Sequence, residues 1–122
     1  HAASDSVPDK EATDLFQKAR NMIQEATEVY EKQKCPERVA VCKRSLGNLC
    51  RQMSIKLDPP KIRKLKLLRE SLEAHEEALR IRRDINKNHP YFPDIGNSMN
   101  DVAMTHLLLV QAQCCVAFDV NS

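Results

Sequence analysis

The stretch from residue 70 to residue 106 constrains the fold of this chain more than any other. Both of its halves place small or apolar side chains three and four residues apart, the spacing that lines up one face of an α-helix. Between the halves, Asn88, His89 and Pro90 predict a turn. The stretch therefore predicts two helices that meet at a sharp corner. The positions on the two faces are Ser71, Leu72, His75, Ala78 and Leu79, and then Ile95, Met99, Val102 and Ala103.

The same periodicity predicts two helices earlier in the chain, over residues 11–34 and 37–56. Their apolar positions are Ala12, Leu15, Phe16, Ala19, Met22, Ile23, Ala26, Val29 and Tyr30, and then Val39, Cys42, Leu46, Leu49, Cys50 and Met53. Gly47 lies inside the second of these helices, where glycine costs about 1 kcal/mol relative to alanine, so it predicts a close helix crossing. A third helix is expected over residues 59–86, with Asp58 as its N-cap, and a fourth over residues 94–118.

Length and composition agree with an all-α fold. A chain of 122 residues can bury one modest core. Two glycines and no tryptophan, beside many residues that favour helices, argue against a sheet. We expect the small, polar residues 1–8 to form a disordered lead and residues 9–122 to form a single helical domain. Short connections predict four antiparallel helices, arranged either as helical hairpins or as a four-helix bundle.

The charge pattern argues against nucleic-acid and membrane partners. The formal net charge is only +2 at pH 7, which is not the concentrated basic excess of a nucleic-acid-binding protein. The basic run over residues 61–69 has no aromatic residues beside it for base stacking. The longest apolar run, residues 107–118, is interrupted by Gln111 and Gln113 and is shorter than the about 20 residues that a membrane span needs.

The cysteines favour a reducing compartment. Cys42 and Cys50 fall on the apolar face of the second helix, and a free cysteine behaves as a small hydrophobic residue. We therefore expect reduced, buried structural cysteines in a cytoplasmic protein. A secreted helical carrier with disulfides is the alternative. The five cysteines, an odd number without a C-x2-C pair, are Cys35, Cys42, Cys50, Cys114 and Cys115.

No pattern in the chain predicts catalysis. His75 and His106 fall on apolar helix faces, where a packed histidine is commoner than a metal ligand or a catalytic base. Glycine-rich phosphate loops are absent from the sequence. We expect no catalytic residues, no metal and no cofactor.

Two segments resemble the tetratricopeptide repeat. Residues 44–50, Arg-Ser-Leu-Gly-Asn-Leu-Cys, are similar to its first helix, and residues 71–79, with Ser71, His75 and Ala78, are similar to its second helix. Residues 12–19, with Ala-x3-Phe-x2-Ala, fit the second-helix pattern as well. Small residues let the paired helices of this family approach closely. The resemblance implies that Gly47, Ala78 and Ala103 lie at such contacts.

The similarity is greatest to the longer repeats of kinesin light chains, in which a basic helix end leads to a His-Pro corner and an Asn-rich helix. Here residues 77–83, Glu-Ala-Leu-Arg-Ile-Arg-Arg, run into the corner at His89 and Pro90. The next helix opens at residues 94–103, Asp-Ile-Gly-Asn-Ser-Met-Asn-Asp-Val-Ala. The resemblance covers about 60 of the 122 residues.

The resemblance implies a non-catalytic interaction or adaptor module that binds a peptide or partner helix in a groove between the second and fourth helices. Arg44, Asn48 and Arg51 would present donors to a carboxylate or an extended backbone. The alternative to such a module is a structural four-helix bundle that dimerises or docks through its C-terminal helix. The implied groove positions are Val41, Arg44, Asn48, Arg51, Asn97, Asn100, Met104 and Leu107.

Overall fold

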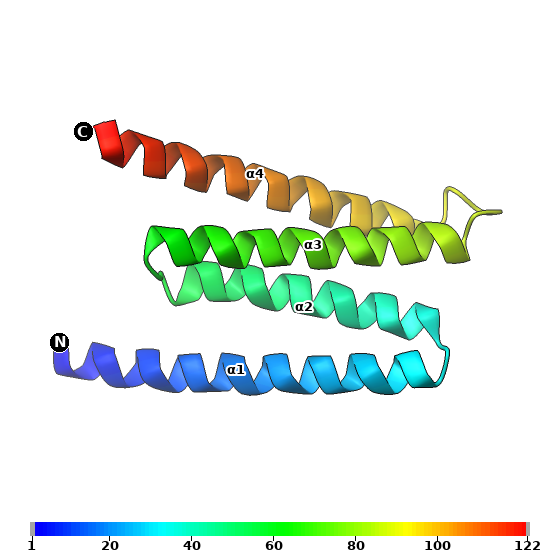
Figure 1. The fold of residues 1–122 in the computed structure, drawn as a ribbon, viewed down its shortest axis with the longest axis horizontal. Helices are drawn as coiled ribbons and strands as arrows, with labels where there is room; N and C mark the ends of the chain where they lie inside the picture. Colours follow the sequence, from blue (N-terminus) through cyan, green and yellow to red (C-terminus); the bar gives the residue numbers. More distant parts are fainter. Residues whose placement is uncertain (1, 122) are drawn as a thin grey trace.

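The computed structural model describes residues 2–121, and the side chains of residues 10–114, as four α-helices with short connections. Helix α1 spans Ala2–Lys32, α2 spans Pro36–Lys56, α3 spans Lys61–Ile85 and α4 spans Pro93–Asn121. Successive helices run in opposite directions (Figure 1). The predicted all-α fold of four antiparallel helices is confirmed.

Two local predictions about helix ends were wrong. The cap of α3 is Pro60, without a side-chain hydrogen bond, whereas Asp58 lies outside the helix with a φ of 42°. The predicted start of the first helix, residue 11, was also wrong, because α1 begins at Ala2; His1 lies outside the described residues. Apolar periodicity located the predicted start, and that pattern reports burial against a neighbour rather than the extent of the backbone helix.

The helices are stacked in chain order. Helix α2 packs against α1 and α3, and α3 packs against α2 and α4, while α1 and α4 form the two opposite edges of the stack (Figure 1). A closed four-helix bundle would bring its first helix against its last, so among the described residues this arrangement is open. Helix α4 diverges from α3 towards its C-terminal end (Figure 1).

Two ion pairs connect alternate helices across the helix between them. Arg20 of α1 pairs with Glu70 of α3, and Arg44 of α2 pairs with Asp101 of α4. Helices in direct contact lie about 8–10 Å apart, so a flat row would place alternate helices at about twice that distance. The two pairs therefore indicate a staggered stack in which alternate helices approach each other.

A close contact in the core joins α2 to α3 at Gly47. The Gly47 carbonyl accepts a hydrogen bond of 2.7 Å from the Ser71 hydroxyl, and the His75 ring lies directly over the glycine. The contacts of Gly47 confirm the close crossing predicted there, and Ala78 is also buried, as expected for a helix contact. The prediction for Ala103 was wrong, because α4 turns a different stripe towards α3 and Ala103 is exposed. That stripe contains Ile95, Ser98, Asp101, Thr105 and Leu109.

The corner between α3 and α4 is fixed by Arg82. Its side chain is buried, and its Nη1 donates to the Ser98 hydroxyl at 2.9 Å and to the Asp94 carbonyl at 3.3 Å. A buried guanidinium needs such acceptors because an unpaired one would lose its hydration without compensation. Arg82 therefore holds the start of α4 against the end of α3. Over the part of the chain that the structure describes, no helix is both long and apolar enough to cross a membrane.

Candidate functional site

The six residues predicted to bind a partner lie on α2 and α4, two helices that are not neighbours in the chain. Arg44, Asn48 and Arg51 are partly buried along α2, and they are spaced so that they share one face of that helix. Asn97, Asn100 and Met104 are exposed on α4. The two segments are joined where Arg44 contacts Asp101, which is adjacent to Asn100 and one turn from Asn97 and Met104. We call this surface the α2/α4 face.

Asp101 is the residue that sequence reasoning missed. It is only 8 % exposed, and its Oδ2 accepts a hydrogen bond of 2.6 Å from Arg44 Nε. A carboxylate inside a buried stripe is rare unless it has a cationic partner. In the sequence, Asp101 falls on the same helix face as Ser98, Thr105 and Leu109. That position could have indicated that its carboxylate pairs with a cation from another helix.

His75 lies beneath the α2/α4 face, between Gly47 and Asp101. The imidazole is fully buried, its Nδ1 lies 3.7 Å from Asp101 Oδ2, and neither ring nitrogen has a hydrogen-bond partner. Burial lowers the pKa of His75 below its ordinary value of 6.5; the Asp101 carboxylate opposes this, and Arg51 and Arg44 lower it further. The ring is therefore neutral at neutral pH and acts as a packed spacer.

The polar side chains of the face differ in how far they are already engaged. Arg44 uses its Nε on Asp101, and its side chain is 37 % exposed, so part of the guanidinium still faces solvent. The side-chain oxygen of Asn48 is buried without a partner. Arg51 makes no ion pair within the described part of the chain, and its charge is thus the less compensated of the two arginines. Arg51 is therefore the better placed of the two to meet a partner's carboxylate.

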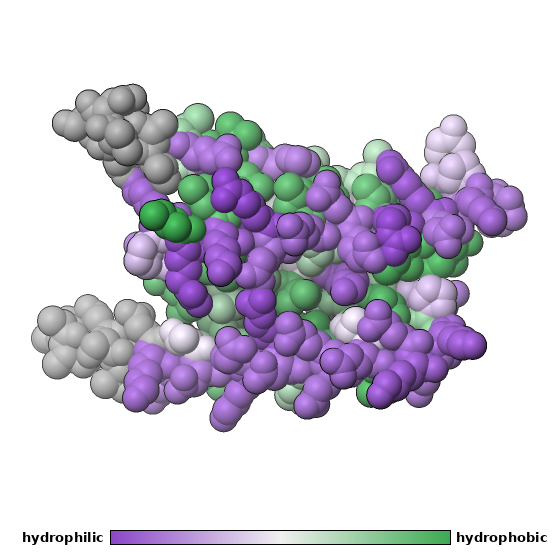
Figure 2. All heavy atoms as spheres, viewed as in Figure 1, coloured by the Kyte–Doolittle hydropathy of each residue, from purple (hydrophilic) through white to green (hydrophobic). Residues whose placement is uncertain are grey.

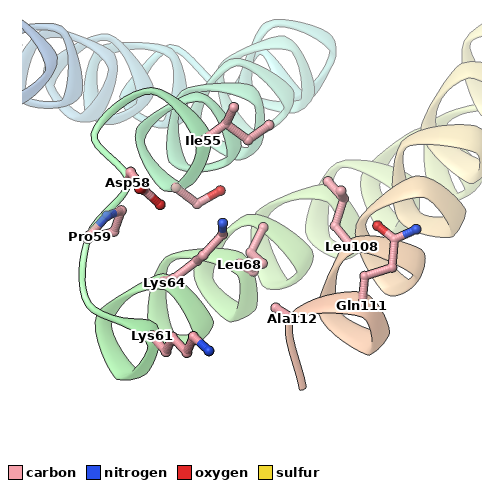
Figure 3. A pocket seen from close by; sticks show the side chains of 10 residues that line it. Ile55, Asp58, Pro59, Lys61, Lys64, Leu68, Leu108, Gln111 and Ala112 are labelled. Atoms are coloured by element: carbon pink, nitrogen blue, oxygen red, sulfur yellow. The ribbon is translucent and has the colours of Figure 1, made fainter. Parts of the chain in front are cut away.

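A cavity of about 390 Å³ opens at the end of the α2/α4 face where α4 diverges from α3. Its walls are Ile55 of α2, Leu68 and Lys64 of α3, and Leu108 and Ala112 of α4 (Figure 3). The connection between α2 and α3 closes one side with Asp58 and Pro59, and Lys61 lies at the rim (Figure 3). No pattern in the sequence indicates this cavity, because its shape depends on the angle between α3 and α4.

Hydrophobic side chains are spread unevenly over the molecule. In Figure 2 they gather over α4, whereas hydrophilic residues cover most of α1. The exposed apolar residues of α4 are Met99, Met104, Leu107 and Val110. Helix α1 also has exposed apolar residues, Leu15, Met22 and Val29, so exposed apolar side chains alone do not distinguish α4 as a contact surface.

The cysteines occupy two kinds of environment. Cys42 and Cys50 are buried, as predicted, whereas Cys114 is exposed and Cys35 is partly buried. The Cys50 thiol donates to Glu70 Oε2 at 3.9 Å. Burial first, and then the charge of Glu70, raise the pKa of Cys50 from 9.0 to about 11. Cys115 lies outside the described side chains.

The described side chains contain no group of three or more His, Cys, Asp or Glu residues that could hold a metal ion. Comparison of the chain with protein-family models, with curated proteins and with solved structures found no match.

Proposed function

We propose that this chain is a non-catalytic protein-interaction module that binds an extended peptide or a partner helix across the α2/α4 face. The observation that carries the proposal is the ion pair between Arg44 and Asp101, which makes one continuous surface from two helices that are not neighbours in the chain. A surface that spans two helices offers parallel rows of side chains to a single bound segment.

The side chains on this face suit a protein partner. Val41, Met104 and Leu107 are exposed apolar residues that would supply contact area. Arg51 and Asn100 offer donors that would fix the register of a bound backbone or carboxylate. Methionine and arginine are enriched in protein interfaces, whereas lysine and glutamate are depleted. The face therefore combines an apolar contribution to affinity with a polar contribution to specificity.

The architecture we propose for the module is that of the tetratricopeptide repeat. Support comes from the contact of Gly47 with His75, which places a small residue of one helix under a large residue of the next. The ion pairs between alternate helices and the open stack also suit a repeat array, in which each unit contacts only its neighbours. We also propose a cytoplasmic location, supported by the burial of Cys42 and Cys50 as free thiols.

The test is a selection from a display library of random peptides on the immobilised chain, followed by measurement of the dissociation constant of the enriched peptides. Arg51→Glu and Met104→Glu should each weaken binding about tenfold, because each removes a contact and adds a like or buried charge. Arg83→Glu, an equal charge change at an exposed position of α3, should leave binding unchanged. Equal affinity for all three variants, or no enrichment over an uncoated surface, would contradict the proposal.

A second candidate function is self-association through α4. Val110 is 54 % exposed and lies with Met99, Ala103 and Leu107 on the side of α4 that no described helix covers. Val110→Glu should convert a dimer to a monomer in analytical ultracentrifugation, whereas Ile62→Glu, at an exposed apolar position of α3, should not. A wild-type chain that sediments as a monomer at all concentrations would eliminate this candidate.

A further inference from the structure

The cavity bounded by Ile55, Leu68 and Leu108 continues the α2/α4 face rather than forming a separate site. Ile55 lies one turn beyond Arg51 on α2, and Leu108 lies one turn beyond Met104 on α4. Both residues line the cavity (Figure 3). A segment that lies along the face would therefore reach the cavity at one of its ends.

The size of the cavity limits what it can hold. Sites for whole small-molecule ligands occupy about 300–1,000 Å³, and this cavity of about 390 Å³ is near the lower limit. It is partly open to solvent and is lined by α2, α3, α4 and the connection between α2 and α3. One large side chain, with the backbone on either side left outside, matches this space better than a complete peptide segment does.

The lining of the cavity combines apolar residues with polar and charged ones, and the polar and charged ones are Ser54, Asp58, Lys61, Lys64 and Gln111. Leu68 is almost completely buried and forms the floor with Leu108 and Ala112, so an apolar side chain would displace water from apolar surface. Lys64 of α3 and Asp58 of the connection line the cavity, and Lys61 lies at its rim. Further positive charge stands nearby on exposed side chains of the same helix, and its first turn contains no acidic residue, although an acidic residue there would stabilise the helix. These exposed basic residues of α3 are Arg63 and Lys66.

We infer that the cavity receives one large apolar side chain of the partner peptide, and that acidic residues flank this side chain in the peptide. The inference rests on the proposed function, because it treats the cavity as one end of the α2/α4 face. The apolar walls select a leucine, phenylalanine or tryptophan side chain. Lys64 and the exposed basic residues Arg63 and Lys66 of α3 select aspartate or glutamate on either side of it, since charge complementarity across an interface governs specificity more than affinity.

The experiment uses three synthetic fluorescent peptides of equal length. One carries tryptophan between glutamates, the second replaces the tryptophan with alanine, and the third replaces the glutamates with lysines. Fluorescence anisotropy should give a dissociation constant at least about tenfold lower for the first peptide than for the other two. Methyl NMR signals of Ile55 and Leu108 should shift only with the first peptide. Equal binding of the three peptides, or the absence of shifts at both residues, overturns the inference.

Two variants with matched controls locate the binding. Ala112→Trp fills the cavity, whereas Ala103→Trp places the same side chain on the exposed side of α4. Lys64→Glu reverses a charge in the cavity lining, whereas Lys87→Glu makes the same change at an exposed position beyond the other end of α3. Ala112→Trp and Lys64→Glu should each raise the dissociation constant of the first peptide at least about tenfold, and each control should raise it less than about twofold. Circular dichroism of each variant checks that the helices are retained.

The outcomes separate the cavity from the wider face. Peptides that lose affinity with Arg51→Glu and Met104→Glu but not with Ala112→Trp would overturn the cavity inference and leave the proposed function standing. If neither the variants of the face nor the variants of the cavity weaken binding, both the proposed function and the cavity inference are wrong. If lauric acid shifts the signals of Ile55 and Leu108 while no acidic peptide does, the cavity binds a fatty acid and the inference is wrong.

Discussion

Gly47 lies directly beneath the imidazole of His75, and a Cβ atom at position 47 would come within 2.5 Å of His75 Nε2. Real Cβ atoms do not approach a ring this closely, and the ring is fully buried and packed. The contact sets the distance between α2 and α3 and so positions the helices on which the α2/α4 face is built. A side chain at position 47 would have to move the ring or separate the helices.

We therefore predict that Gly47→Ala destabilises the protein. The substitution should raise the helix propensity of α2 by about 1 kcal/mol but cause an overpacking cost of about 1–3 kcal/mol, so the expected net change in the free energy of unfolding is a loss of up to about 2 kcal/mol. Urea denaturation followed by circular dichroism measures this change. A more stable Gly47→Ala variant would show that the ring moves aside without cost.

Gly96→Ala should have the opposite effect. Gly96 lies in α4, where a Cβ atom would meet nothing within 4 Å. Alanine there should increase the free energy of unfolding by about 0.5–1 kcal/mol, because it reduces the entropy of the unfolded chain without a steric cost. The same urea titration serves, and a destabilised Gly96→Ala variant would contradict the open surroundings of this glycine.

The ion pair between Arg44 and Asp101 should contribute measurably to stability. A double-mutant cycle with Arg44→Met and Asp101→Asn should give a coupling energy of about 1–2 kcal/mol, less than that of a fully buried pair because the Arg44 side chain is partly exposed. The coupling energy should be smaller in about 1 M salt, where the Debye length is about 3 Å, than in about 0.1 M salt, where it is about 10 Å. A coupling energy near zero would mean that the pair does not hold α2 and α4 together.

The buried His75 predicts a pH dependence of stability. Its pKa in the folded state is below the ordinary value of 6.5, so the unfolded chain binds a proton more readily. The contribution of the neutral ring is complete above pH 6.5 and is lost as the pH falls from there towards the lower pKa of the folded state. In urea titrations across this pH interval, the free energy of unfolding of the wild type should fall with falling pH, and His75→Phe should remove this dependence.

The control for the His75 slope is His89→Gln, which changes an exposed histidine in the turn before α4. This variant should keep the wild-type dependence on pH. If His75→Phe and the wild type lose stability equally on acidification, carboxylates rather than the imidazole account for the effect.

The raised pKa of Cys50 predicts a slow thiol. A shift from 9.0 to about 11 reduces the thiolate fraction at neutral pH about a hundredfold, and burial restricts access of the reagent further. Iodoacetamide labelling with peptide mapping should therefore modify the exposed Cys114 early and Cys50 only after denaturant is added. If Cys50 is labelled as fast as Cys114 in the native protein, the burial and raised pKa of Cys50 are contradicted.

The sequence by itself determined the number of helices, their approximate bounds and the close crossing at Gly47. Those features depend on spacing along the chain: apolar residues at a helical period must be buried on one side, and a glycine inside a helix is retained where a neighbour comes close. The same reasoning failed for Ala103, because a small residue does not by itself show whether another helix lies on it.

Tertiary structure decided which surfaces meet. The sequence placed Arg44 on a helix face but did not identify Asp101 as its partner, since the two residues lie on helices separated by a third and their pairing depends on the stagger of the stack. The cavity near Leu108 likewise exists because α4 diverges from α3, and that angle is the result of all the contacts between the two helices. Local spacing fixes which side of a helix is buried, whereas the neighbours that cover it are set by packing over the whole chain.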